Sequence, residues 1–142
     1  MKVKSSRTPI AALVAVLAGM LAAAPPALAH HSFAMFDFSH TVTIKGTVKE
    51  FRWTNPHVIL LVTAAPKAAE AGEVWSMELT SPGNLTRLGW SHHSFKPGDR
   101  LTLEFNPLRD GKHGGAFKQA TLLDTGQVLS SNLREAEKPG LK

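Results

Sequence analysis

Alternating apolar and polar residues from Thr41 onward predict a domain built mainly of β-strands. In the first segment the apolar residues stand at even positions up to Val48 and at odd positions after Glu50. Such a change of parity indicates a β-bulge near Lys49 and Glu50, where the strand bends sharply. The next segment, 58–62, is apolar at every position, which is typical of a buried central strand.

Further along the chain, the same alternation predicts three more strands, at 75–79, 101–105 and 116–123. A short last strand is expected to begin near Thr125-Gly126. Two stretches rich in charge together with alanine or glycine are typical of hairpin loops, namely Pro66 to Gly72 and Arg109 to Gly115.

One short helix is predicted between the third and fourth strands. Ser81-Pro82 supplies an N-cap hydroxyl followed by proline at the first helical position, and Gly89 can end the helix. Three strands, a helix and two strands, with a bulge in the first, is the order of an OB-type barrel. We therefore expect an all-β fold with one short helix, as a small OB-like barrel of five to six strands. An open β-sandwich is the alternative.

The first 29 residues have the three-part pattern of a secretory signal peptide. Basic residues precede an apolar run from Ile10 to Ala24, which is shorter than the ~20 residues of a membrane-spanning helix. Two prolines end this run, and Ala27-x-Ala29 places small residues where signal peptidase reads them. We expect cleavage after Ala29 and a periplasmic or secreted protein that meets the membrane only through this peptide.

The remaining chain is divided into a single β-barrel domain, 30–133, and a loose polar tail, 134–142. Cleavage removes three basic residues and no acid, which lowers the formal net charge from +5 to +2. Because the mature part has no basic cluster with interleaved aromatic residues, we expect no nucleic-acid binding. The chain has no cysteine, which excludes disulfides and thiolate metal sites.

The chain has seven histidines, all in the expected mature part, and this number suggests metal binding. If His30 is the new N-terminus, its α-amine and ring Nδ1 can close one chelate ring, and a third nitrogen would complete a histidine brace. His31 offers a competing mode through the amine, its own amide and its ring. Imidazole suits copper, zinc and nickel, and Cu(II) binds most strongly in the divalent series, so copper is expected before zinc. A frayed terminus without function is the alternative.

His57 is the best candidate for the third nitrogen. It follows Trp53-Thr54-Asn55-Pro56, and the proline fixes the backbone just before it. The alternative is a histidine packed inertly at a barrel end. Glu78 stands on the polar face of its strand and could be a weak axial ligand or orient a bound histidine, although a surface carboxylate is the simpler interpretation.

The other histidines are weaker candidates. His92 and His93 are adjacent in a loop, and on an extended segment their rings would point apart and not share one metal. His113 is expected to be exposed in the glycine-rich hairpin, and His40 to be a turn residue. Met35 and Met77 could serve Cu(I), but core packing explains them more simply.

Several short motifs resemble those of a family of small exported bacterial proteins of unknown function. The start His30-His31-Ser32-Phe33 and the motif Trp53-x-Asn55-Pro56-His57 carry this resemblance most specifically. It continues through Asp37 and Leu85 and through five further stretches, namely Gly46-Thr47-Val48, Glu78-Leu79-x-Ser81-Pro82, Arg87-x-Gly89-Trp90, Lys96-Pro97-Gly98-Asp99 and Pro107-Leu108-Arg109-Asp110-Gly111. The resemblance implies that the His-His start and the Asn-Pro-His histidine belong together, and it supplies no activity.

The sequence thus favours an exported metal-binding protein, a copper carrier or buffer that uses His30, His57, His31 and Glu78, with a periplasmic partner protein as a further expectation. The alternative is an OB-type module that binds a small molecule, glycan or partner protein through Trp53, Trp75 and Trp90 without metal. An oxidative copper enzyme ranks last. No nucleophile elbow, phosphate loop or His-Glu-x-x-His motif is present, so catalysis has little support.

Overall fold

The computed structural model describes residues 33–64 and 72–131. Four of the sequence predictions therefore fall outside the described residues, namely the signal peptide, the pair His30 and His31, the hairpin loop of residues 66–71, and the tail 134–142. No helix within the described ranges is long and apolar enough to cross a membrane.

Six strands and two short helices make up the described chain. In order they are η1 (Phe33–Met35), β1 (Val42–Arg52), β2 (Ile59–Ala64), β3 (Glu73–Glu78), α2 (Pro82–Arg87), β4 (Arg100–Pro107), β5 (Gly114–Leu122) and β6 (Val128–Ser130). Each strand predicted from the alternation is present, including the short last one.

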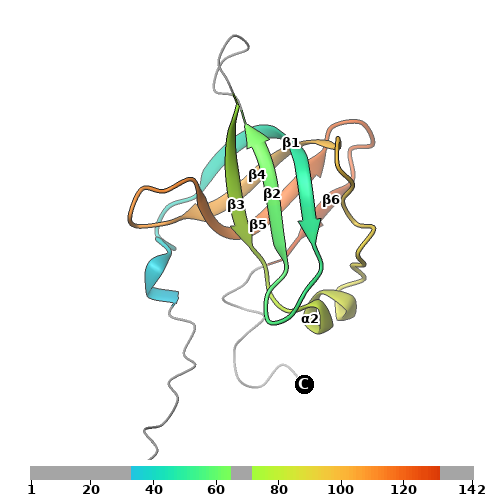
Figure 1. The fold of residues 1–142 in the computed structure, drawn as a ribbon, viewed down its shortest axis with the longest axis horizontal. Helices are drawn as coiled ribbons and strands as arrows, with labels where there is room; N and C mark the ends of the chain where they lie inside the picture. The colour runs from blue at the N-terminus through green and yellow to red at the C-terminus, as the bar shows by residue number, and fades with distance from the viewer. Residues whose placement is uncertain (1–32, 65–71, 132–142) are drawn as a thin grey trace, which may run out of the picture. The chain divides into compact units, whose positions relative to one another are not determined.

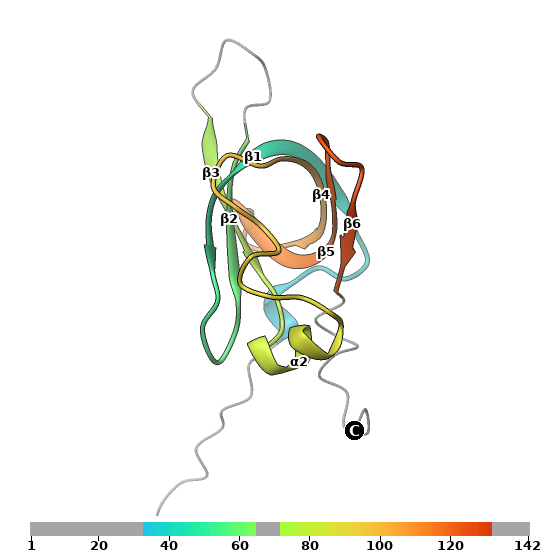
Figure 2. The ribbon, with the colours of Figure 1, turned by 90° about the vertical axis from the view of Figure 1, so that its right-hand side faces the viewer.

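The strands close into a barrel. Along the sheet the order is β3-β2-β1-β4-β5-β6, and an additional parallel pairing between β3 and β5 joins the two sides. Figure 1 shows the strands from the side, and Figure 2 looks into the ring that they form. The ring β1-β2-β3-β5-β4, with a helix between β3 and β4, is the OB arrangement. This confirms the predicted OB-like barrel, and the open β-sandwich is wrong.

The bulge in β1 is what lets one strand serve both sides of the barrel. The segment Val42–Thr47 pairs with β4, while Thr47–Arg52 pairs with β2. The register with β2 shifts between Val48 and Glu50, where the parity of the sequence changes. The extra residue bends the strand, as the sequence predicted.

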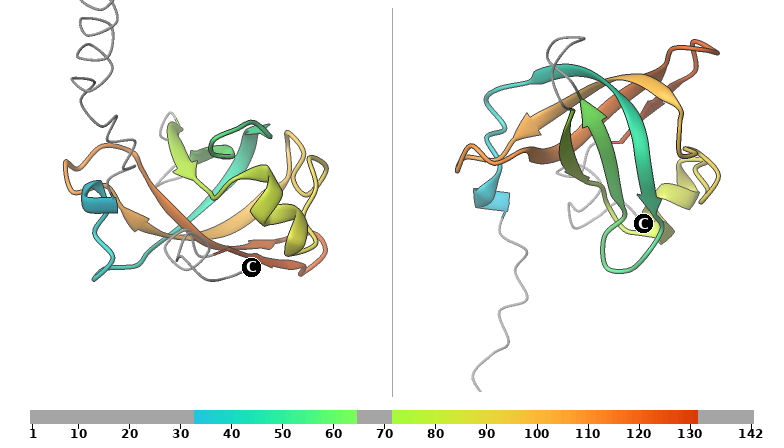
Figure 3. Two further views of the ribbon diagram at one scale, coloured as in Figure 1. Left: turned by 90° about the horizontal axis from the view of Figure 1, so that it is seen from below. Right: turned by 45° about the horizontal axis from the view of Figure 1, so that its top comes forward.

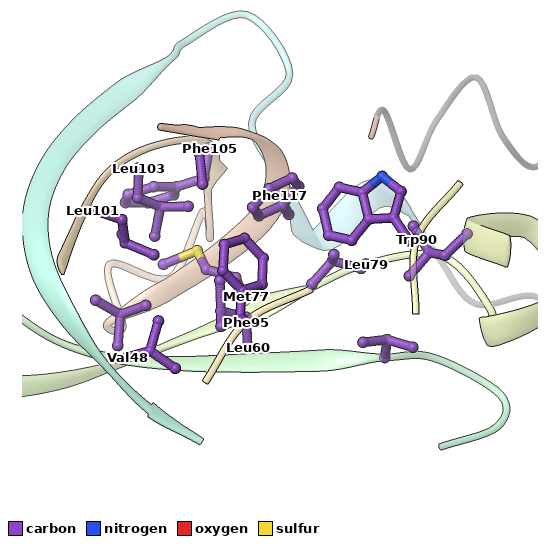
Figure 4. Packing of buried hydrophobic residues seen from close by; sticks show 14 residues of the cluster. Val48, Leu60, Met77, Leu79, Trp90, Phe95, Leu101, Leu103, Phe105 and Phe117 are labelled. Atoms are coloured by element: carbon purple, nitrogen blue, oxygen red, sulfur yellow. The ribbon is translucent and has the colours of Figure 1, made fainter. Parts of the chain in front are cut away.

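The core fills the inside of the ring (Figure 4). The largest fully buried side chains are Phe95, Phe105, Phe117, Leu60, Met77, Leu79, Leu85, Leu101 and Leu103, with two valines. The expectation that β2 is buried on both faces is wrong, because Ile59 and Leu61 are only half-buried. A closed barrel has a single inner face, and within residues 33–64 and 72–131 no second sheet covers the outer face of β2.

The helix α2 begins and ends where the sequence indicates. The side chain of Ser81 accepts a hydrogen bond from the Asn84 amide, and Pro82 occupies the first turn. Leu85 is the buried residue that fixes the helix to the core. Gly89, after the last turn, has a φ of +84°, a left-handed conformation that glycine adopts without strain.

A short N-terminal segment, Ala34–His40, lies along the end of β4 and is called the strap below. Phe36 forms an isolated antiparallel bridge with Leu108, and its ring packs in a small cluster with Ala116. The Arg109 amide donates to the Met35 carbonyl at 2.9 Å, and the Asp37 amide donates to the Pro107 carbonyl at 2.8 Å. Figure 3 shows the resulting position of η1 beside the β4–β5 hairpin. The strap is therefore anchored to the barrel by its backbone and by one buried ring.

Candidate functional site

His57 lies at the entrance to β2, and its ring is held by the backbone of the neighbouring strand. Its Nδ1 is 3.0 Å from the carbonyl oxygen of Leu79, and only 9% of the side chain is exposed. The carbonyl can only accept a hydrogen bond, so Nδ1 is the donor and carries the hydrogen. In the neutral ring the lone pair is then on Nε2.

Two backbone hydrogen bonds explain why His57 is so placed. The Val58 amide donates to the Thr80 carbonyl at 3.2 Å, and the Leu79 amide donates to the Val58 carbonyl at 2.9 Å. These bonds continue the β2–β3 pairing beyond the first residue of β2 and the last residue of β3. The Asn55–Pro56 peptide bond before His57 is cis. His57 directly precedes Val58, whose amide and carbonyl are both hydrogen-bonded to the segment that follows β3.

Glu78 lies beside this ring. Its Oε1 is 3.4 Å from His57 Nδ1, and a quarter of its side chain is exposed. Glu78 pairs with Ile59 on β2 and with Ala116 on β5, so it stands where the two sides of the barrel meet. Of the four predicted site residues, the structure thus brings together His57 and Glu78, while His30 and His31 lie outside the described ranges.

The strap passes close to the same part of the barrel. Phe36 packs against Ala116, and Ala116 is the parallel register partner of Glu78. Nothing in the sequence indicates this proximity, because residues 36, 78 and 116 come from three distant segments. Within residues 33–64 and 72–131, no group of three or more histidine or carboxylate side chains is arranged to hold a metal ion.

A compact turn in the strap joins an acid, a hydroxyl and an imidazole. Ser39 Oγ donates to Asp37 Oδ1 at 2.6 Å, and His40 Nδ1 is 2.7 Å from Asp37 Oδ2. Hydrogen bonds from the Ser39 hydroxyl, the His40 ring and the Ser39 amide hold the pKa of the Asp37 carboxyl well below its usual range.

This turn lacks the geometry of a catalytic triad. The same nitrogen of His40, Nδ1, faces both the carboxylate and the Ser39 hydroxyl, which is 3.0 Å away. A triad needs the acid on one ring nitrogen and the nucleophile on the other. The hydroxyl hydrogen of Ser39 is moreover committed to Asp37. His40 is a turn residue, as the sequence predicted.

His92 and His93 depart from the expectation that their rings point apart. The segment is a turn and not an extended strand, and the two ring centroids are 3.6 Å from each other. His113 is exposed, as expected, and stacks on Trp75 with 4.7 Å between the ring centroids. Its Nε2 is 3.2 Å from a carboxylate oxygen of Glu73.

The three tryptophans do not form a common binding surface. Trp90 is 4% exposed and packs edge-on against Phe95 and Phe117 inside the barrel (Figure 4), so its predicted role in ligand recognition is wrong. Its indole fills the core where α2 leads into the following loop. Trp53 and Trp75 are half-buried and pack against the core from its edge.

The strand order and the α2 position define an OB-type barrel protein. The chain belongs to a family of unknown function, DUF6152, whose model matches residues 16–118. This confirms the resemblance to a family of unknown function, while export of the chain stays a prediction. Among proteins with curated functions, none matches this sequence.

Two solved structures of a mitochondrial single-stranded DNA-binding protein from S. cerevisiae are similar in fold. The first has a TM-score of 0.46 at 13% identity and covers 59% of this chain and 93% of its own. The second has a TM-score of 0.44 at 15% identity and covers 58% and 92%. At these values the similarity adds nothing to what the strand order already establishes.

Proposed function

We propose that the mature protein binds a transition metal, copper before zinc, and carries or buffers it without turnover. His30 supplies its α-amine and Nδ1, and His57 supplies Nε2 as the third nitrogen. His31 offers the competing N-terminal mode, and Glu78 acts on the His57 ring. The proposal includes export to the periplasm or the exterior, because only cleavage after Ala29 creates the chelating amine.

The observation that carries this proposal is the hydrogen bond between His57 Nδ1 and the Leu79 carbonyl. Metal-binding histidines commonly donate the other ring N–H to a carbonyl or carboxylate, which fixes the tautomer and orients the ring. His57 has this arrangement, with Nδ1 committed to the backbone and the lone pair on Nε2. A histidine that is packed inertly at the barrel end would make the same hydrogen bond. Metal titration therefore distinguishes the metal-binding from the inert interpretation of His57.

Glu78 supports the same interpretation. A carboxylate 3.4 Å from Nδ1 raises the electron density on the ring and compensates positive charge that a metal brings to Nε2. The axial-ligand role considered from the sequence is the weaker one, because the carboxylate faces Nδ1 and not the opposite nitrogen.

Chain length allows His30 to take part. Five residues lie between it and Phe36, and an extended chain of this length spans at most ~20 Å. Phe36 contacts Ala116, which pairs with Glu78, and neighbouring strands are about 4.8 Å apart. A tether of this length supports the pairing of His30 with His57 in the proposed site.

The decisive experiment compares two chains of the same composition. One carries an additional Gly-Ser-Gly-Ser segment before His30, and the other carries it after Lys142. Titration with Cu(II), followed by electron paramagnetic resonance, should show tight binding to the mature chain and to the C-terminally extended chain. The N-terminally extended chain should lose most of its affinity, because its first amine stands four residues before His30 and no longer forms small chelate rings with the ring or the amide of His30 or His31. Equal binding by both chains overturns the proposal.

His57 is tested in the same titration by His57→Ala and His57→Gln, with His113→Ala as the control. Both His57 variants should bind copper more weakly and change the spectrum, since one nitrogen ligand is lost. Circular dichroism verifies that the variants are folded. An unchanged spectrum removes His57 from the site.

The expectation that the protein does not bind nucleic acid stays a prediction, which a single-stranded DNA titration checks.

A further inference from the structure

The turn 91–94 is a small rigid platform that carries two adjacent imidazoles. The Ser91 amide donates to Ser94 Oγ at 2.9 Å, and the Ser94 amide donates to the Ser91 carbonyl at 2.9 Å. The His93 amide donates to Ser91 Oγ at 3.2 Å. Three hydrogen bonds within four residues thus fix the backbone that carries His92 and His93.

Buried aromatic residues anchor this turn on both sides. Trp90 precedes it and is 4% exposed, and Phe95 follows it and is 2% exposed. Their rings contact each other edge-on at 5.7 Å within the core. The turn therefore cannot move away without disturbing the core, and the two imidazoles are presented to solvent at a fixed place.

The two rings contact each other instead of other groups. Their centroids are 3.6 Å apart with an angle of 44° between the planes, and both residues are exposed. Among the residues that the structure describes, neither ring has a hydrogen bond or an ion pair. His40 and His113 differ in this respect, because Asp37 holds the first ring and Glu73 and Trp75 hold the second.

We propose that His92 and His93 form a second, solvent-exposed site that chelates a divalent transition metal ion through one nitrogen of each ring. The fixed turn supplies both ligands from one side, and water completes the coordination. The rings need to open slightly from their present contact, which exposed side chains achieve by rotation about their χ angles. Two neutral imidazoles favour Cu(II) above Ni(II) and Zn(II) by the usual affinity order.

Such a site differs in kind from the one built on His57. It has two protein ligands, lies open to water and is expected to exchange its metal readily. It does not depend on cleavage after Ala29 or on His57, so it stands if the N-terminal site fails. It also predicts that copper titrations of this protein show a weaker second event.

The test uses the mature chain and Cu(II) alone as the probe. His92→Asn, His93→Asn and the double variant are compared with His113→Asn by calorimetric titration. If both rings chelate one ion, either single variant should lower the Cu(II) affinity of the second binding event by about tenfold or more. The double variant should lower this affinity little further. Independent single-histidine binding instead predicts that each single variant removes half of the sites without changing their affinity, and this result overturns the proposal.

A second measurement assigns the binding to these rings directly. Once any tighter site is filled, further Cu(II) added below one equivalent should broaden the ring proton resonances of His92 and His93 together, before those of His40 and His113. Binding titrations that are unchanged in the double variant, or broadening of only one of the two rings, overturn the proposal. Circular dichroism of each variant verifies that the barrel is intact, since the substituted side chains are exposed.

Discussion

Ala116 on β5 lies in parallel register with Glu78 on β3. This pairing closes the barrel, and it also brings three distant parts of the chain to one place. Phe36 of the strap packs on Ala116, and the Glu78 carboxylate contacts the His57 ring. The candidate site is thus assembled at the seam where the sheet closes, and each of its residues can be tested against a matched residue elsewhere on the barrel.

Glu78→Gln should weaken Cu(II) binding by about tenfold while leaving the fold unchanged. The substitution keeps the size of the side chain and removes the negative charge beside His57 Nδ1, and such supporting groups contribute 10–100-fold to metal affinity. Competition titration with a copper chelator measures the change.

Glu104→Gln is the control for that substitution, because Glu104 is also half-buried on a barrel strand but pairs with Thr43 and Gln119. It removes the same charge and should leave the affinity unchanged. An equal loss in both variants would mean that net charge, and not the contact with His57, is responsible.

Asp37 should titrate below the ordinary aspartate pKa of about 3.9. Its pKa is lower in the folded than in the unfolded chain, so its stabilising contribution is complete above the ordinary value and is lost as the pH falls through the folded value. Carboxyl carbon shifts, followed by NMR against pH, measure this directly. Ser39→Ala should raise the pKa of Asp37 towards the ordinary value, because the hydrogen bond from the Ser39 hydroxyl is the main cause of the lowered pKa. Titration at the same pH in both proteins would contradict the assigned hydrogen bond.

Trp90→Ala should lower the free energy of unfolding by about 3–5 kcal/mol, as for other large aromatic residues in cores. Its indole packs between Phe95 and Phe117, with centroid distances of 5.7 Å and 5.6 Å. Trp53→Ala is the comparison, because Trp53 is only half-buried, and a smaller loss is expected. Urea unfolding measures both. A loss in Trp53→Ala as large as that in Trp90→Ala would contradict this distinction.

The fold could be predicted largely from the sequence because the information is local. Alternation fixes which residues face inward, the change of parity locates the bulge, and Ser81-Pro82 marks the helix start. The two-sided burial expected for β2 failed for a local reason too, since an apolar run does not reveal whether a second layer covers its outer face. Ile59 and Leu61 are half-buried because the described part of the chain forms one sheet and supplies no such layer.

The site was less accessible to prediction because its contacts are long-range. Neither the contact between His57 and the Leu79 carbonyl nor the register of Glu78 with Ala116 follows from spacing along the chain. The proximity of the His92 and His93 rings likewise results from the backbone conformation of the turn 91–94, which residue spacing does not determine. The Ser-His-His-Ser sequence was the available signal, since serines on both sides can form such a turn.

Gly115→Ala tests the close approach of β4 and β5 that the barrel requires. A Cβ at this position would stand 3.0 Å from the carbonyl carbon of Asn106 and nearer still to its oxygen, so the backbone of β4 would have to shift. Overpacking of this kind typically costs about 1–3 kcal/mol. Gly83→Ala is the matched control, because a Cβ at Gly83 meets no atom within 4 Å and the residue lies in α2. Alanine should leave the free energy of unfolding there unchanged or raise it by up to about 1 kcal/mol. Equal effects of the two substitutions in urea unfolding would contradict the packing of Gly115 against Asn106.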